Sequence, residues 1–154
     1  MKPAPRVVGP AANGALLAQA PFFAGLSPAR LARVAALGRV ERHPQDSHIY
    51  VLGDPADDFY VLAEGMVRFT LGLGRRATSA GEIIRRGQVF GWAAIVENAR
   101  TRIANAFCLT PCEVIAINGK ELMALMDADH SVGYALTKQL AVLLTSELTS
   151  FAAG

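Results

Sequence analysis

A glycine-led turn and one arginine are the residues whose types and spacing suggest chemistry in this sequence. Gly91 opens a short apolar stretch that ends at Ile95. A helical turn there would present free backbone N–H groups at its start, where an anion is favoured. Arg102 supplies a planar fork of donors that suits phosphate oxygens. We therefore expect an anion site. The residues that would form it are Gly91, Trp92, Ala93, Ala94, Ile95 and Arg102.

Two of these residues admit a second interpretation. Trp92 either fills the pocket as a core residue or offers a flat face on which a ligand stacks. Arg102 either holds an anion or is a surface arginine paired with Glu97 or Glu82. The sequence pattern leaves both alternatives open.

The residue pattern gives little support for a zinc site, a catalytic centre or a haem site. Cys108 and Cys112 have no second Cys/His pair to complete a zinc site, so we expect core thiols. His43, His48 and His130 are dispersed, and no nucleophile with a matching base is recognisable. A histidine or cysteine could in principle ligate haem iron, although nothing marks an axial ligand. We expect no catalytic residue, no metal site and no resident cofactor.

The first part of the chain predicts a tail followed by two short helices. Residues 1–12 contain three prolines and are expected to be a flexible tail, whereas residues 13–154 form one domain. Helical periodicity runs between Gly14 and Leu37, and Ser27-Pro28 is a typical helix start, because serine caps and proline suits the first turn.

From His48 the hydrophobic period changes to two, and turn residues recur about every ten positions, which is typical of short strands in a roll. Val67, Phe69 and Leu71 alternate with polar neighbours, so that strand should have one wet face. The expected strands are residues 48–52, 59–63, 66–71, 81–84, 88–90, 102–109 and 113–117.

Helical periodicity returns after Asn118-Gly119, first in a short helix and then in a long one over residues 131–151 with Ser131 as its cap. The long helix has an apolar stripe, which favours a helix-mediated homodimer; the alternative is that the stripe only packs on the roll. The stripe consists of Leu136, Leu140, Leu144, Leu148 and Phe151.

Composition limits the class of protein. The 154 residues make one ordinary domain, 52% of them are hydrophobic and 18% are charged, and the net charge is +2. That composition excludes a disordered chain. The small net charge gives no strong positive electrostatic potential that would attract nucleic acid. Two cysteines and no long apolar segment predict a cytoplasmic protein without a membrane span.

The stretch from Ile49 to Val67 resembles the opening strands of cyclic nucleotide-binding domains, as in catabolite activator proteins and the regulatory subunits of cyclic-AMP-dependent kinases. The segments Gly87 to Ile95, Arg102 and Cys112-Glu-Val resemble the phosphate-binding cassette and the strands that follow it. The resemblance implies a mainly β fold: a β-roll or jelly roll, also called a double-stranded β-helix, with two short N-terminal helices and a long C-terminal helix.

The resemblance also implies roles for the cassette. In that family a glutamate binds the ribose hydroxyl, an arginine binds the cyclic phosphate, and a small residue follows the arginine. Arg102 stands at the family's spacing and carries over, whereas Trp92 replaces the glutamate and Ile103 replaces the small residue. The ligand-binding residues that the resemblance implies are Phe90, Gly91, Trp92, Ala93, Ala94, Ile95, Arg102 and Ile103. Cyclic AMP, cyclic GMP or a related small anionic ligand is the implied partner, with ribose affinity weakened by the lost carboxylate.

We therefore expect a non-enzymatic sensor module whose ligand moves the C-terminal helix and changes what the dimer offers to an effector protein. The sequence stops where a catabolite-activator-type regulator would begin its helix-turn-helix, so we expect no direct DNA binding. The alternative is a degenerate, ligand-free dimer that acts as a protein-interaction adaptor.

Overall fold

The computed structural model of the chain describes residues 6–9, 14–73, 76–77 and 81–153. The helical elements are α1 (Gly14–Gln19), the 3-10 turn η1 (Pro21–Phe23), α2 (Pro28–Ala36), the 3-10 turn η2 (Trp92–Ile95), α3 (Gly119–Ala128) and α4 (His130–Ala153). The strands are β1 (Arg6–Gly9), β2 (Gly38–His43), β3 (His48–Tyr50), β4 (Asp58–Glu64), β5 (Val67–Leu73), β6 (Arg76–Ala77), β7 (Glu82–Ile84), β8 (Val89–Phe90), β9 (Ala104–Cys108) and β10 (Cys112–Asn118).

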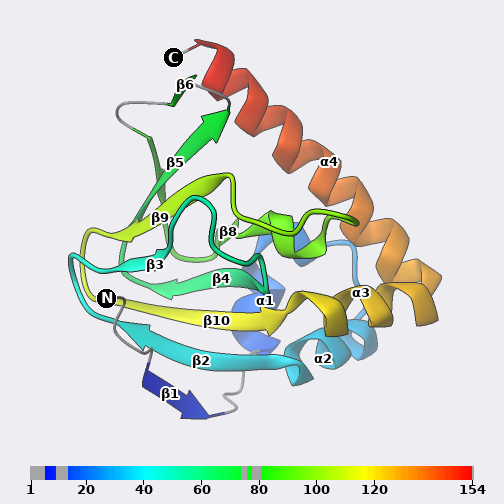
Figure 1. Cartoon of the computed structure of the whole chain (residues 1–154). Helices are drawn as coiled ribbons and strands as arrows, with labels where there is room; N and C mark the ends of the chain where they lie inside the picture. Colours follow the sequence, from blue (N-terminus) through cyan, green and yellow to red (C-terminus); the bar gives the residue numbers. More distant parts are fainter. Residues whose placement is uncertain (1–5, 10–13, 74–75, 78–80, 154) are drawn as a thin grey trace.

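Two antiparallel sheets form the roll. One has the order β1-β2-β10-β4-β8, and the other has the order β3-β9-β5-β6 with β7 also paired to β5. The helices gather at one end, and α4 runs diagonally across the open side of the roll (Figure 1). The predicted β-roll with flanking helices is therefore confirmed.

The sheet that contains β4 and β10 is buried on both faces, because each face packs on a different core. Tyr60 and Leu62 point into the roll with the side chains of the facing sheet. Phe59 and Val61, which alternate with them along β4, pack against the helices. Because alternate side chains of a strand point to opposite faces, β4 contributes side chains to both cores. In β5 the predicted apolar residues Val67, Phe69 and Leu71 are buried, at 0%, 3% and 4% exposure.

Strand β2 was not predicted, because its sequence Gly-Arg-Val-Glu-Arg-His lacks apolar alternation. The structure buries Glu41 and His43 of this strand and pairs them. The Nε2 atom of His43 lies 3.3 Å from Glu41 Oε1, and Arg39 binds both Glu41, at 2.9 Å, and Asp58, at 2.7 Å. Although burial opposes its ionisation, bonds from His43 and Arg39 hold the pKa of Glu41 below its ordinary value.

The described part of the expected tail is a strand. Arg6–Gly9 form β1, which pairs antiparallel with β2. The remainder of the range 1–12 lies outside the described residues.

Side-chain caps mark the starts of α2 and α4. Ser27 accepts a hydrogen bond from the Arg30 N–H at 3.3 Å, as predicted. The predicted cap Ser131 is wrong, because α4 begins at His130 and the Asp129 carboxylate accepts the Ser131 N–H at 3.1 Å. Asp129 also forms an ion pair with Arg30 at 2.9 Å, which ties α4 to α2.

The predicted apolar stripe of α4 divides into two parts. Leu136 is fully buried, and Leu140 packs partly buried against the same helical core. Farther along, Leu148 is 55% exposed, and Tyr134 and Val142 on α4 are 69% and 64% exposed. The first half of the stripe therefore packs on the roll, whereas apolar side chains on other parts of the helix face solvent. No described helix is long and apolar enough to cross a membrane.

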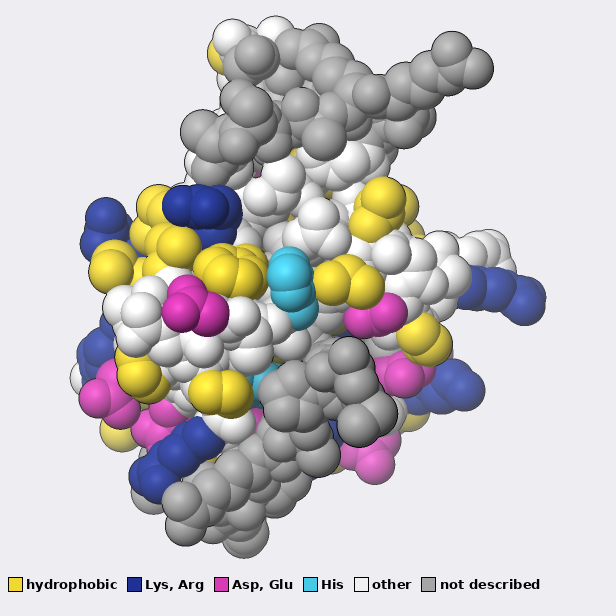
Figure 2. Space-filling model, turned by 60° about the vertical axis from the view of Figure 1, so that its left-hand side comes forward, with side chains coloured by type: hydrophobic (Ala, Val, Ile, Leu, Met, Phe, Trp, Pro, Cys, Tyr) yellow, Lys and Arg dark blue, Asp and Glu magenta, His cyan; other side chains and the backbone are white. Residues whose placement is uncertain are grey.

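Hydrophobic, basic and acidic side chains are interspersed over the face of the molecule presented in Figure 2. That face is formed by the left-hand side of Figure 1, where β2 ends and β3 and β10 begin. Among the described residues on this face, the charge is mixed and does not form one large basic patch.

Close backbone packing at two glycines joins the cassette to the helices. A Cβ atom at Gly119, the first residue of α3, would overlap the backbone carbonyl of Ala94 in η2. A Cβ atom at Gly133 in α4 would lie 2.7 Å from the Met126 carbonyl oxygen of α3. The turn η2, α3 and α4 thus form a continuous chain of backbone contacts.

We predict that Gly119→Ala lowers the free energy of unfolding by about 1–3 kcal/mol, because η2 and α3 must move apart to admit the methyl group. Urea unfolding followed by circular dichroism measures the change. Gly14→Ala is the matched control, since a Cβ atom there meets nothing within 4 Å. Equal stability of the two variants would contradict the close packing of η2 on α3.

Candidate functional site

Arg102 lies inside the roll, 3% exposed, and its guanidinium is held by backbone carbonyls. Its Nη1 donates to the Gly91 carbonyl at 3.0 Å, and its Nη2 donates to the Asp58 carbonyl at 2.6 Å. No carboxylate forms an ion pair with it among the described residues. The interpretation as a surface arginine paired with Glu97 or Glu82 is therefore wrong.

The backbone of Arg102 is fixed by the loop between β3 and β4. Its N–H donates to the Asp54 carbonyl at 2.8 Å, and its carbonyl accepts the Gly53 N–H at 2.9 Å. Pro55 and Thr101 form an isolated bridge beside this pair. The segment that carries the arginine therefore runs beside this loop and is joined to it by two backbone hydrogen bonds.

Aromatic rings form one wall around the guanidinium. Arg102 Cζ stands 4.2 Å from the Tyr50 ring centroid and 5.8 Å from that of Tyr60, within the range of cation–π attraction. Tyr60 stacks on Phe90 at 5.1 Å, with 15° between the ring planes. Burial raises the pKa of the Tyr50 hydroxyl, while the positive charge of Arg102 opposes that rise. Both tyrosines are therefore neutral hydroxyls beside a cation.

Gly91 is required at its position by conformation and by space. Its φ is +78°, in the left-handed region that favours glycine. An added Cβ would lie 2.9 Å from Tyr60 Cδ2 and 3.2 Å from Arg102 Nη1. Only glycine brings the start of η2 this close to the arginine.

Trp92 fills space between the two cores. Its side chain is half-buried and packs against both the core of the roll and the core of the helices. Its indole Nε1 is buried without a hydrogen-bond partner, and so is Arg102 Nε. These are the buried side-chain nitrogens and oxygens without a partner among the described residues. Both residues line the same hollow.

The hollow between Trp92 and Arg102 is small. Its free volume is about 10 Å³, close to the least that holds one water molecule. A larger hollow of about 320 Å³ also borders Arg102, and its lining includes Asp54, Asp57 and Asp58. These acidic residues disfavour a phosphate there, although the Asp58 carboxylate is paired with Arg39.

The structure brings most of the expected site residues together. Gly91, Trp92, Ala93, Arg102 and Ile103 line the small hollow. The other three residues do not: Phe90 belongs to the aromatic stack, and Ala94 and Ile95 pack into the core of the helices.

Sequence reasoning missed three residues that shape the site, namely Tyr50, Tyr60 and Asp58. The two tyrosines stand at inward positions of predicted strands, so their aromatic type beside a predicted anion site was the available signal. Asp58 contributes its carbonyl, which no side-chain pattern reveals. Its carboxylate is held by Arg39 at 2.7 Å.

Other chemically active side chains do not form a centre. No group of three or more His, Cys, Asp or Glu residues that could hold a metal ion occurs within the described ranges. Cys108 and Cys112 are buried free thiols, as expected for core cysteines.

A family model matches more than half of the chain. The model of the cyclic nucleotide-binding domain matches residues 40–129. The chain is 28% identical over 132 residues to Glutaminase 1 of Bradyrhizobium diazoefficiens, covering 86% of this chain but only 21% of that protein. The similarity is therefore to about a fifth of that longer relative.

Solved structures with the same fold include a putative cyclic nucleotide-binding protein from Geobacter metallireducens, with a TM-score of 0.75 and 22% identity over 90% of this chain and 98% of that one. Another is the regulatory domain of Toxoplasma gondii PKA, solved with cAMP. Its TM-score is 0.70 and its identity 25%, over 83% of this chain and 48% of that one.

We predict that Arg102→Met lowers the free energy of unfolding by at least about 2 kcal/mol, because two carbonyl oxygens lose their donor and Tyr50 loses the cation. Arg100→Met is the matched control, since Arg100 is exposed two residues away. Urea unfolding measures both variants. Losses of equal size would show that the contacts of Arg102 do not stabilise the roll.

Proposed function

The chain belongs to the cyclic nucleotide-binding domain family, and we propose that it is a non-enzymatic regulatory module whose cassette takes a small anionic ligand. Cyclic AMP or cyclic GMP is the first candidate, because the family binds cyclic nucleotides. The relevant residues are those around Gly91, together with Arg102.

One observation carries the proposal: two buried N–H donors without acceptors belong to residues that line the same hollow, Trp92 Nε1 and Arg102 Nε. A buried donor without a partner costs about 1–3 kcal/mol. A buried guanidinium without a carboxylate adds an uncompensated positive charge. An anionic oxygen placed in this hollow would neutralise the positive charge of Arg102 and accept a hydrogen bond from one of the two donors. This supports a phosphate or another oxyanion as the ligand.

A nucleotide requires the cassette to open. The hollow holds about one water molecule, so Trp92 and Ile103 must move to admit a cyclic phosphate and its ribose. Arg102 Nε can take a phosphate oxygen directly, and a second bond from this arginine would replace one of its backbone carbonyls. Ligand binding is therefore coupled to a displacement of η2 in this proposal.

The output would pass through the backbone contacts of Gly119 with Ala94 and of Gly133 with Met126. A shift of η2 would press on the start of α3 and, through α3, on α4. We further propose that α4 forms a two-fold homodimer through its exposed apolar side chains and that an effector protein reads its position.

A ligand-free adaptor is the second candidate. It is favoured by the same cassette: both terminal nitrogens of Arg102 already bind backbone carbonyls, and Trp92 packs where the family has a glutamate. In that case the module would act only through its helical surface.

The first prediction here separates the two candidates with the one tryptophan of the chain. Addition of cyclic AMP or cyclic GMP should change Trp92 fluorescence and raise the melting temperature, because Trp92 must move for the ligand to enter. The non-cyclic nucleotide 5′-AMP serves as the control. No change in either measurement at millimolar cyclic nucleotide would refute ligand binding and leave the adaptor.

Trp92→Glu tests the same point in the opposite direction. Restoring the carboxylate should raise the affinity for cyclic nucleotide by roughly ten- to a hundred-fold, through a charge-assisted hydrogen bond to the ribose. Calorimetry measures this affinity without the tryptophan. Unchanged affinity in this variant would show that the ribose does not lie beside residue 92.

The second prediction concerns the dimer. Leu148→Glu should convert a dimer to a monomer in light scattering, because it places a charge on the exposed apolar side of α4. At about 100° per residue, Ser150 lies on the opposite side of the helix, so Ser150→Glu is the charge-matched control. A dimer mass that survives Leu148→Glu would place the interface elsewhere.

A further inference from the structure

A groove lies between α4 and the roll, apart from the cassette. Its volume is about 500 Å³, within the range of small-molecule sites. Its apolar lining includes Phe22 of η1, Ile84 of β7, Val89 of β8 and Leu143 of α4. None of its lining residues belongs to either hollow beside Arg102.

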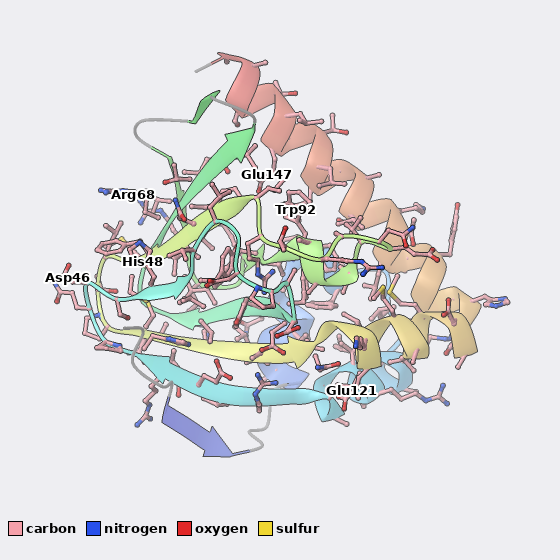
Figure 3. All side chains as sticks on the ribbon, viewed as in Figure 1. Asp46, His48, Arg68, Trp92, Glu121 and Glu147 are labelled. Atoms are coloured by element: carbon pink, nitrogen blue, oxygen red, sulfur yellow. The ribbon has the colours of Figure 1, made fainter. Side chains whose placement is uncertain are left out.

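A buried carboxylate lines this groove. Glu147 is 7% exposed and is the one buried residue of α4 between Thr137 and Ser150. Figure 3 shows it on the side of the helix that faces the roll. Its neighbour Leu148 is 55% exposed. This part of α4 therefore turns an acid inward and an apolar residue outward, the reverse of what packing alone favours.

Nothing in the described protein neutralises this acid. Among the described residues, none forms a hydrogen bond or ion pair with the Glu147 carboxylate, whose oxygens reach the groove and are not among the fully buried unpaired atoms named above. The other carboxylate that lines the groove is Glu82 of β7. Burial, and then the negative charge of Glu82, raise the pKa of Glu147 to about 7. At neutral pH the groove therefore holds a partly ionised acid that lacks a cation.

Among the described side chains, the basic residues of the turn after β7 and of α4 have other partners. In the turn after β7, Arg85 Nη1 lies 3.5 Å from Met66 Sδ, and Arg86 Nη1 donates to Gln19 Oε1 at 3.1 Å. On α4 itself, Lys138 Nζ lies over the Tyr134 ring at 4.9 Å from its centroid. The third wall, η1, is Pro-Phe-Phe and has no charge.

We propose that this groove binds a small organic cation, an ammonium group on an apolar body, with the ammonium between Glu82 and Glu147. The apolar lining suits the body of such a ligand, and the two acids suit its charge. A buried charge without a partner destabilises a fold, and a ligand of opposite charge removes that cost. Because one wall is the roll and the other is α4, the ligand would also hold the helix against the roll.

The probe for the test is hexylammonium, with hexanol as its uncharged counterpart and hexanoate as its anionic one. At pH 8 hexylammonium should raise the melting temperature in a concentration-dependent way, while hexanol and hexanoate should not. At pH 6 the stabilisation should be weaker, since Glu147 then takes up a proton. Calorimetry at both pH values gives the affinity.

Two variants test the acids directly. Glu147→Gln and Glu82→Gln should each weaken hexylammonium binding by about ten-fold or more, because each removes one charge-assisted contact. Glu97→Gln is the matched control, as Glu97 is exposed and does not line the groove. Glu147→Gln should itself be at least as stable as the natural chain at pH 8, which shows that it is folded.

Equal stabilisation by hexylammonium and hexanol would overturn the proposal and show a merely apolar groove. Equal binding by Glu147→Gln and Glu97→Gln would also overturn it, as would no stabilisation by millimolar hexylammonium. Titration of Glu147→Gln with cyclic nucleotide distinguishes this site from the cassette, because the cassette residues are untouched in that variant.

Discussion

A buried guanidinium, that of Arg102, ties together the segments that make the binding end of the roll. It joins the start of η2 through the Gly91 carbonyl and the start of β4 through the Asp58 carbonyl, and it stacks on Tyr50 of β3. A charge taken out of water is tolerated only where dipoles and polarisable faces replace its hydration. The glycine at 91, the aromatic wall and the bonded loop at Asp54 are the local conditions that this burial requires.

The same electrostatic logic connects the two sites. In the cassette a buried cation lacks an anion, and in the groove a buried acid, Glu147, lacks a cation. Between them, η2 touches α3 through Gly119, and α3 touches α4 through Gly133. Because these contacts are backbone against backbone, they leave little room for side-chain adjustment, and displacement of one element is passed to the next. In the proposed function, the two sites would thus act on one helix from two directions.

Much of the fold followed from local pattern. The strand period, the turn residues and the helix start at Ser27 predicted the roll and its flanking helices, since these signals depend on neighbours in sequence. The charged strand β2 did not follow, because Glu41, His43 and Arg39 are compatible with burial only once they meet one another and Asp58. In the site, Gly91 and Arg102 were found from chemistry and spacing, but the carbonyls that bind the arginine belong to the backbone and have no sequence signature.

The sequence by itself determined the family, the roll, the long final helix and the pairing of a glycine-led turn with Arg102, because each depends on residue type and spacing along the chain. Tertiary structure alone decided that Arg102 is buried and bound to the protein's own carbonyls, that Trp92 joins two cores, and that α4 turns Glu147 inward and Leu148 outward. The physical reason is that burial and charge compensation depend on which distant segments meet. In this chain those segments are the loop before β4, the turn η2 and the far end of α4.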